Sequence, residues 1–307
     1  METSVWTWGT GAAFGRELGI APNRARRHHV ATSIIGRENE TTTFHFLIDA
    51  GSPCVEAMVD AGVPPPDVLF VTHPHFDHFS DLDKLANNRL RSLSMLGRPP
   101  APLPVICTRE CLEHPDTGLK SRLGYLGGTI QWWPVRSYDV WYSARRTDAF
   151  LLPTRTLPSH NVTFEMSFMA LPVYHGFAPG ACMLIFRLHD GSKKIVISGD
   201  FESIGETVIE HPELKGADMV LLDTNTIKAI GTNHTNWEQN RYLIARWAAG
   251  RGKTRVLLNH IGGYEDYSQG YFDHIPTEED WKREMAKFEP PAGTTVDLAE
   301  DGKSYIV

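Results

Sequence analysis

Residues 68–78 read Val-Leu-Phe-Val-Thr-His-Pro-His-Phe-Asp-His, an apolar run that leads directly into three histidines and an aspartate. The apolar run predicts a short strand, so that His73 lies where the strand ends and a loop begins. Alternate residues of an extended segment point the same way, and His73 and His75 can therefore reach one ion together. Asp77 and His78 lie past the bend, where they can point toward a second ion. Because imidazole nitrogens and carboxylate oxygens are usual ligands of zinc and similar divalent ions, the spacing predicts a metal site.

Further ligand-type residues follow apolar runs that read as strands. His175, Asp200 and His260 each stand directly after such a run, at residues 169–174, 194–199 and 255–259. A sandwich of sheets exposes the ends of its strands on one rim. We therefore expect these side chains to meet the cluster of residues 73–78 at that rim.

The spacing His-x-His-x-Asp-His resembles the signature of the metallo-β-lactamase-fold hydrolases, and its full form resembles the branch that binds two metals. The resemblance covers about residues 1–110 and 166–270. It implies an α+β fold, in which residues 1–307 form a single domain built as a four-layer αββα sandwich with the metal site at one edge. Residues 115–165 are rich in Trp, Tyr and Arg, and they then form an insertion. This insertion either covers the active site or provides a satellite core or a dimer surface.

The resemblance also implies a complete set of metal ligands. His73, His75 and His175 bind the first ion, Asp77, His78 and His260 bind the second, and Asp200 bridges both. This set fits zinc, and manganese or iron would also be compatible with it. A hydroxide held between ions about 3.5–4 Å apart would be the nucleophile. Asp77 also counts among the catalytic residues. Asp49 would lie beneath residues 73–78, which we call the metal loop, and would orient them.

A segment near residue 234 indicates the substrate class. Residues 234–236, His-Thr-Asn, open a predicted helix, with capping-box spacing between Thr235 and Glu238. The arrangement is similar to the phosphodiesterase branch of the fold, which includes tRNA 3′-end-processing endonucleases and cyclic-phosphate phosphodiesterases. In that branch an acid supports a histidine that stands beside the metals. By this resemblance His234 protonates the leaving alkoxide, and Asp223 is its supporting partner.

Composition narrows the class of protein and of partner. Of 307 residues, 41% are hydrophobic and 22% are charged, with a formal net charge of −7, which fits an ordinary globular protein. The negative charge and the lack of a long Gly/Pro-rich arm argue against RNA and leave a small anionic molecule as the expected substrate. No apolar run is long enough to predict a membrane span. The N-terminus lacks the features of a secretory signal and the four cysteines read as reduced thiols, which together indicate the cytoplasm.

The sequence thus predicts a dimetal-dependent hydrolase that cleaves a phosphodiester of a small nucleotide-like molecule. Two alternatives use the same site: hydrolysis of a lactone, ester or amide, and a diiron oxidoreductase. A homodimer would match related phosphodiesterases, which are often dimers. Residues 264–276 directly follow the last expected ligand, and they either cover the pocket or simply pack.

Overall fold

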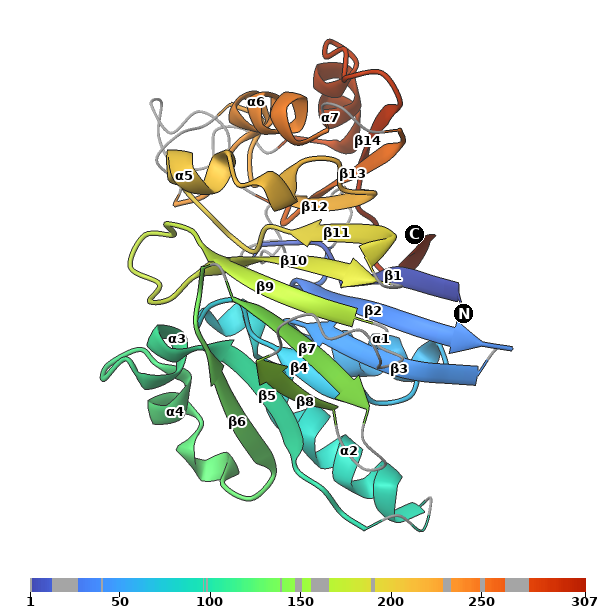
Figure 1. The fold of residues 1–307 in the computed structure, drawn as a ribbon, viewed down its shortest axis with the longest axis vertical. Coiled ribbons are helices and arrows are strands. Elements are labelled where there is room, and N and C mark those ends of the chain that lie inside the picture. The colour runs from blue at the N-terminus through green and yellow to red at the C-terminus, as the bar shows by residue number, and fades with distance from the viewer. Residues whose placement is uncertain are drawn as a thin grey trace.

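The chain builds two β-sheets that pack face to face, with helices on the outer face of each (Figure 1). The structure is a computed structural model, and it describes residues 2–12, 27–39, 41–95, 97, 99–138, 140–146, 151–155, 166–188, 191–228, 233–248, 252–262 and 276–307. The two packed sheets and their outer helices confirm the four-layer αββα sandwich predicted from the sequence.

The first sheet contains seven strands within the described residues, in the order β15-β1-β2-β3-β4-β5-β6. They are β1 (Glu2–Gly9), β2 (Ala31–Glu38), β3 (Thr41–Ile48), β4 (Val68–Phe70), β5 (Leu103–Thr108), β6 (Ile130–Val135) and β15 (Lys303–Ile306). Neighbours from β15 to β3 are antiparallel, whereas β3 to β6 run parallel. The parallel order brings the C-terminal ends of β3, β4 and β5 to one edge of the sheet.

The second sheet has eight strands in the described part of the chain, in the order β14-β13-β12-β11-β10-β9-β7-β8. They are β7 (Trp141–Arg146), β8 (Leu151–Arg155), β9 (Met166–Pro172), β10 (Cys182–Leu188), β11 (Lys193–Ile197), β12 (Met219–Asp223), β13 (Thr254–Asn259) and β14 (Thr294–Leu298). Strands β11 to β14 are parallel to one another. Strands β9 and β11 both pair antiparallel with β10, so β9 and β11 to β14 all run in one direction.

Helices and helical turns connect these strands over the outer faces. Those of the first half are α1 (Cys54–Asp60), η1 (Phe76–His78), α2 (Leu82–Met95), α3 (Arg109–Glu113), α4 (Leu119–Arg122) and η2 (Gly124–Leu126). Those of the second half are α5 (Glu206–Ile209), η4 (Pro212–Leu214), α6 (Trp237–Trp247) and α7 (Glu278–Met285). None of the described helices has both the length and the apolar composition that crossing a bilayer requires.

The start of α6 corrects one prediction. The helix begins at Trp237, and its capping box is formed by Asn236 and Gln239, one residue later than the predicted pair Thr235 and Glu238. The Asn236 side chain accepts a hydrogen bond from the backbone N–H of Gln239 at 2.9 Å. Asn is as good an N-cap as Thr or better, and a shift of one residue preserves the same spacing. Sequence pattern alone therefore could not separate the two registers.

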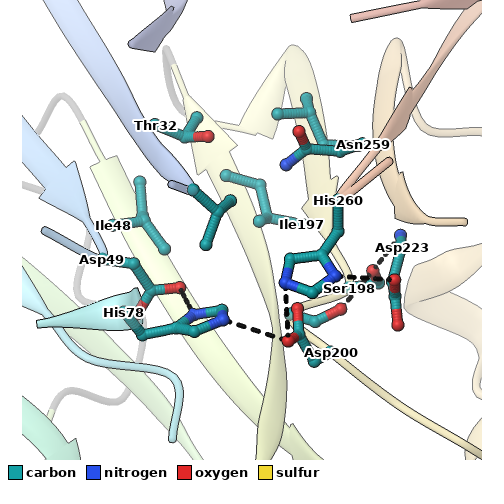
Figure 2. Close-up of a pocket in the computed structure, with 13 residues that line it drawn as sticks. Thr32, Ile48, Asp49, His78, Ile197, Ser198, Asp200, Asp223, Asn259 and His260 are labelled. Carbon is teal, nitrogen blue, oxygen red and sulfur yellow. Dashed lines mark hydrogen bonds and ion pairs between the residues drawn. The ribbon is translucent and has the colours of Figure 1, made fainter. Parts of the chain in front are cut away.

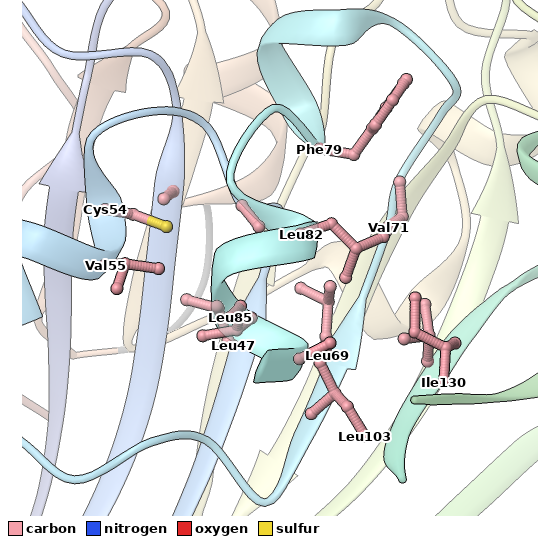
Figure 3. Packing of buried hydrophobic residues seen from close by; sticks show 14 of the residues in the cluster. Leu47, Cys54, Val55, Leu69, Val71, Phe79, Leu82, Leu85, Leu103 and Ile130 are labelled. Atoms are coloured by element: carbon pink, nitrogen blue, oxygen red, sulfur yellow. The ribbon is translucent and has the colours of Figure 1, made fainter. Parts of the chain in front are cut away.

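Strand β4 shows how the sequence sets the layers. Val68 and Phe70 pack in the core between the two sheets. Leu69 and the following Val71 pack on the outer side with residues of α1 and α2, such as Val55, Leu82 and Leu85 (Figure 3). Both faces of the strand are buried, which explains why its sequence is a continuous apolar run. Burying one Leu- or Phe-sized side chain contributes about 1.5–3 kcal/mol. The strand that leads into the metal loop is thus anchored by buried side chains on both of its faces.

The described part of residues 115–165 contributes strands to both sheets. Strand β6 extends the first sheet, and β7 and β8 form an antiparallel hairpin at the edge of the second. Because β7 pairs antiparallel with β9, the hairpin runs away from the edge at which β9 ends. Residues 147–150, 156–165 and 263–275 lie outside the described residues, so that a cover over the site by these segments stays a prediction.

Candidate metal centre

The expected site residues stand at the C-terminal ends of strands, on one rim of the sandwich. His73 follows β4, His175 follows β9, Asp200 follows β11, Asp223 ends β12 and His260 follows β13. The first belongs to one sheet and the others to the second sheet. The rim is therefore built from both sheets, and the cluster depends on how the sheets pack.

One carboxylate oxygen, Asp200 Oδ2, lies at the centre of the site. It lies close to a ring nitrogen of each of five histidines: His78 at 3.0 Å, His260 at 3.1 Å, His73 at 3.7 Å, and His175 and His234 at 3.9 Å. Five imidazoles around one oxygen would be poorly compensated if all were cations. The same positions suit a carboxylate that bridges two metal ions.

The first candidate ion position is made of histidines alone. His73, His75 and His175 each offer a ligand atom, and these atoms lie within 4.8 Å of one another. His75 Nδ1 and His175 Nε2 are 3.0 Å apart. His73 Nε2 is buried and has no hydrogen-bond partner. A buried nitrogen without a partner is costly, and a shared cation would satisfy it, so this donor set fits a divalent metal ion.

The second candidate position mixes carboxylates with histidines. Asp77, His78, Asp200 and His260 are all buried and offer ligand atoms within 4.8 Å of one another. Asp77 Oδ2 lies 3.4 Å from His260 Nε2 and 3.7 Å from His78 Nε2. Buried carboxylates normally require a compensating positive charge. Two carboxylates and two imidazoles fit a borderline divalent ion such as zinc.

Hydrogen bonds to the far side of two rings fix their tautomers. His175 Nδ1 lies 2.7 Å from the carbonyl oxygen of Asn233, which can only accept, so Nδ1 carries the proton and Nε2 faces the cluster. His78 Nδ1 donates to Asp49 Oδ2 at 2.9 Å, and its Nε2 likewise faces Asp200. The His175 ring therefore presents a lone pair where an ion would bind. Burial opposes protonation of His78, but Asp200, Asp49 and Asp77 outweigh it and raise the pKa of His78 well above its usual value, so a metal ion would have to displace the proton on its Nε2.

Asp49 connects the His78 ring to the backbone of the metal loop. Its Oδ1 accepts from the backbone N–H of Thr72 at 2.8 Å, and its Oδ2 accepts from the Thr72 hydroxyl, also at 2.8 Å. Asp49 has φ 57° and His260 has φ 58°, a left-handed conformation that is uncommon for residues other than glycine. Such strained residues cluster at functional sites, where the surrounding structure holds them.

The two candidate positions differ in their protonation. Burial lowers the pKa of His73 well below its usual range and that of His175 to about 3, so both rings are neutral. Burial also opposes protonation of His260, but Asp200 and Asp77 outweigh it and raise the pKa of His260 to about 9. A metal ion would compete with that proton for the same lone pair, which makes binding pH-dependent.

His234 forms a third group with Asp200, Asp223 and His260. Its Nδ1 lies 3.2 Å from Asp223 Oδ2, its ring stacks on that of His260 with centroids 4.7 Å apart, and its side chain is 16% exposed. The end of β12 is tied to α6, because Asn240 Nδ2 donates to the Asp223 carbonyl at 2.7 Å. The structure thus brings His234 and Asp223 to the site as a hydrogen-bonded pair.

Figure 2 shows part of this arrangement: Asp49 and His78 lie on one side of Asp200, and His260 and Asp223 lie on the other. A small cavity of about 10 Å³ lies behind these residues. Its other lining side chains include Ile48 and Ile197, which belong to different sheets. The candidate ligands are therefore backed by a packed core, which restricts their movement.

Two further residues support the site and were not predicted from the sequence. Thr72 binds Asp49 as described above, and Asn233 accepts from His175 through its carbonyl oxygen. Asn233 has φ 60°, and Asn is among the few residues that adopt this conformation readily. The one hint in the sequence is their position: Thr72 directly precedes His73, and Asn233 directly precedes His234. No pattern in the sequence, however, indicates which backbone carbonyl a distant histidine will contact.

Comparisons with known proteins agree with this geometry. A family model described as beta-lactamase superfamily domain matches residues 45–261. A comparison with curated proteins by sequence gives no match.

Solved structures of similar fold span nearly the whole chain. The metallo-beta-lactamase fold protein YhfI from Bacillus subtilis is 17% identical with a TM-score of 0.64, and the match covers 100% of both chains. A diphosphatase from the PhnP family is 19% identical with a TM-score of 0.65, covering 100% of this chain and 98% of the other. The short form of human tRNase Z is 15% identical with a TM-score of 0.57, covering 98% of each. The matched family range spans well over half of the sequence and includes every residue that meets at the rim, and the chain therefore belongs to the beta-lactamase superfamily, with the metallo-β-lactamase fold.

Proposed function

We propose that this chain is a hydrolase that cleaves a phosphodiester of a small nucleotide-like molecule with two divalent metal ions. The observation that carries the proposal is His234, a partly exposed ring that is held by a carboxylate directly beside the metal-ligand cluster. The names of two similar structures, a diphosphatase and a tRNase Z, support a phosphate-containing substrate.

The ions would be held by the two groups described above. His73, His75 and His175 would hold the first, Asp77, His78 and His260 the second, and Asp200 both. Zinc suits this mixture of imidazole and carboxylate, and manganese or iron would also fit. When bound, such ions supply Lewis acidity, which lowers the pKa of water from about 15.7 toward 7 and offsets the negative charge of the phosphate.

His234 would supply the proton that the reaction consumes. When the P–O bond to the leaving group breaks, the departing alkoxide takes a proton, and an imidazolium at the edge of the cluster can donate it. Asp223 lies on the Nδ1 side of the ring, where its carboxylate orients the imidazole. Asp77 and Asp200 are both buried in the cluster, so that neither is placed to serve this role.

The test compares leaving groups in His234→Ala and His234→Gln. For a phosphodiester with an alkyl leaving group, which needs a proton, we expect kcat to fall by roughly 10²–10⁴-fold. For a 4-nitrophenyl leaving group, which departs as a stable anion, we expect a much smaller loss. Elemental analysis should show an unchanged metal content. His114→Ala, at an exposed histidine of the first half, serves as the control.

Two results would contradict the proposal. An equal loss with both leaving groups, together with loss of a metal ion, would make His234 a ligand rather than an acid. If the wild-type protein hydrolyses lactones, esters or amides but no phosphodiester, the substrate class is wrong. Iron with visible absorption and turnover that requires O₂ would instead indicate a diiron oxidoreductase.

A further inference from the structure

Large apolar side chains are exposed on the two segments that carry His75 and His175. Phe177 is 99% exposed, Phe76 is 65% exposed and Tyr174 is 56% exposed. Single exposed hydrophobic residues are ordinary on protein surfaces and need no explanation. Here, however, three aromatic residues each lie within two positions of a candidate metal ligand. We call these three side chains the aromatic rim.

The two segments that carry the aromatic rim meet at the first ion position. Phe76 directly follows His75, and Tyr174 and Phe177 flank His175 on either side. The rings of His75 and His175 have their centroids 4.8 Å apart. Neighbouring Cα atoms are about 3.8 Å apart along the chain, so the aromatic residues start only one or two residues from the ion position.

The backbone that carries the aromatic rim is firmly held. The N–H and carbonyl oxygen of Tyr174 both bond to the segment 202–203, at 2.8–3.2 Å. The turn that presents Phe177 is closed by a 3.0 Å hydrogen bond from Ala178 N–H to the His175 carbonyl. On the other segment, the ring of Phe76 contacts the buried ring of Phe79 edge-on, with centroids 5.8 Å apart. The exposed rings are therefore presented by an ordered frame.

We propose that Phe76, Tyr174 and Phe177 form a subsite that binds a flat aromatic substituent of the phosphodiester, such as a nucleobase or an aryl group. This inference rests on the proposed function and narrows its substrate class. The floor of the site is polar and charged, and it suits the phosphate. The residues of the aromatic rim lie one or two positions along the chain from His75 and His175, so a group attached to the phosphate would be within reach of their exposed rings. Aromatic rings bind flat π-systems by stacking, largely independent of which base is present.

The test uses two substrates with the same leaving group. Phenyl 4-nitrophenyl phosphate and methyl 4-nitrophenyl phosphate differ only in the group that stays on the phosphate. We expect the wild-type protein to prefer the phenyl ester by at least about 10-fold in kcat/KM. Phe177→Ala should raise KM for the phenyl ester and leave the methyl ester unchanged, and Phe76→Ala/Phe177→Ala together should remove the preference. Phe177→Leu keeps an apolar side chain without a flat ring and should restore little of it.

A binding measurement keeps the inference separate from the reaction. Calorimetry of phenylphosphonate and methylphosphonate binding to the metal-loaded protein requires no turnover. If no phosphodiester is hydrolysed but Phe177→Ala selectively weakens phenylphosphonate binding, the subsite stands and the proposed reaction fails. Met95→Ala, at a residue of α2 that is 87% exposed, is the matched control and should change neither ligand.

Three results would overturn the inference. The wild-type protein could show no preference for the phenyl group in either assay. The variants could weaken both ligands equally, which would make the aromatic rim a support for the loops rather than a contact. Finally, the double variant could change the oligomeric state, measured by light scattering, with the preference unchanged. The aromatic rim would then be a contact between copies of this chain.

Discussion

Replacing Asp49 by Asn should weaken metal binding, although Asp49 itself is not a candidate ligand. Asp49 accepts three hydrogen bonds, two from Thr72 at 2.8 Å and one from His78 Nδ1 at 2.9 Å. In the Asn variant, Oδ1 can still accept from the backbone N–H of Thr72, but the amide NH₂ then faces His78 Nδ1 as a donor. His78 would satisfy it by moving its proton to Nε2. That nitrogen lies 3.0 Å from Asp200 and faces the second ion position, so the proton would block its lone pair.

The magnitude follows from these contacts. Losing a charged acceptor for buried donors costs about 1.5–3 kcal/mol in stability. Removing a partner that orients a metal ligand typically lowers affinity by about 10–100-fold. We expect both effects, with the affinity change confined to the second ion.

The assay is a competition titration of the metal-free protein against a fluorescent zinc chelator, combined with urea unfolding of the same preparation. Asp116→Asn makes the same chemical change at an exposed turn and should match the wild-type protein in both measurements. If Asp49→Asn binds both ions within about 2-fold of the wild-type affinity, the orientation of His78 does not depend on Asp49, and the reasoning about tautomers is refuted.

Three further predictions concern the fold. Burial lowers the pKa of His45 from 6.5 to about 4, so stability is full above pH 6.5 and falls by about 3 kcal/mol as the pH drops through 4; urea unfolding at several pH values checks this, and an equal slope in His45→Gln would contradict it. Gly180→Ala should lower the unfolding free energy by more than about 2 kcal/mol, because its Cβ would lie 2.2 Å from Thr108 Oγ1 at φ +65°. Gly191→Ala, at φ +88° with nothing within 4 Å, isolates the cost of the backbone conformation, and equal losses would rule out the clash. Asn236→Ala should cost about 1 kcal/mol through loss of the α6 cap, measured by thermal unfolding, and no change would show that the cap is dispensable.

The layers and the candidate ligands could be predicted because each depends on local sequence. An apolar run such as residues 68–71 indicates a strand buried on both faces, and a ligand-type residue directly after it must lie at the strand end. Three such residues, His175, Asp200 and His260, follow strands that run in one direction, so they meet at one rim. These three residues are therefore brought to the same rim by the direction of their strands alone.

The supporting contacts could not be predicted because they depend on how distant segments approach each other. The carbonyl oxygen of Asn233 accepts from His175 only because two loops meet at the rim, and the sequence separation of 58 residues gives no sign of it. The α6 cap was misplaced for a different reason: Thr235 and Asn236 are both good caps with suitable partners, and tertiary contacts selected one. The β7–β8 hairpin runs away from the rim because β7 pairs antiparallel with β9. The sequence of the hairpin alone does not specify this pairing.

Anomalous diffraction from crystals of the zinc-loaded protein is the most direct test of the metal centre. We predict two neighbouring peaks, one among His73, His75 and His175 and the other among Asp77, His78 and His260, with Asp200 in contact with both. A single peak, or peaks away from these side chains, would contradict it.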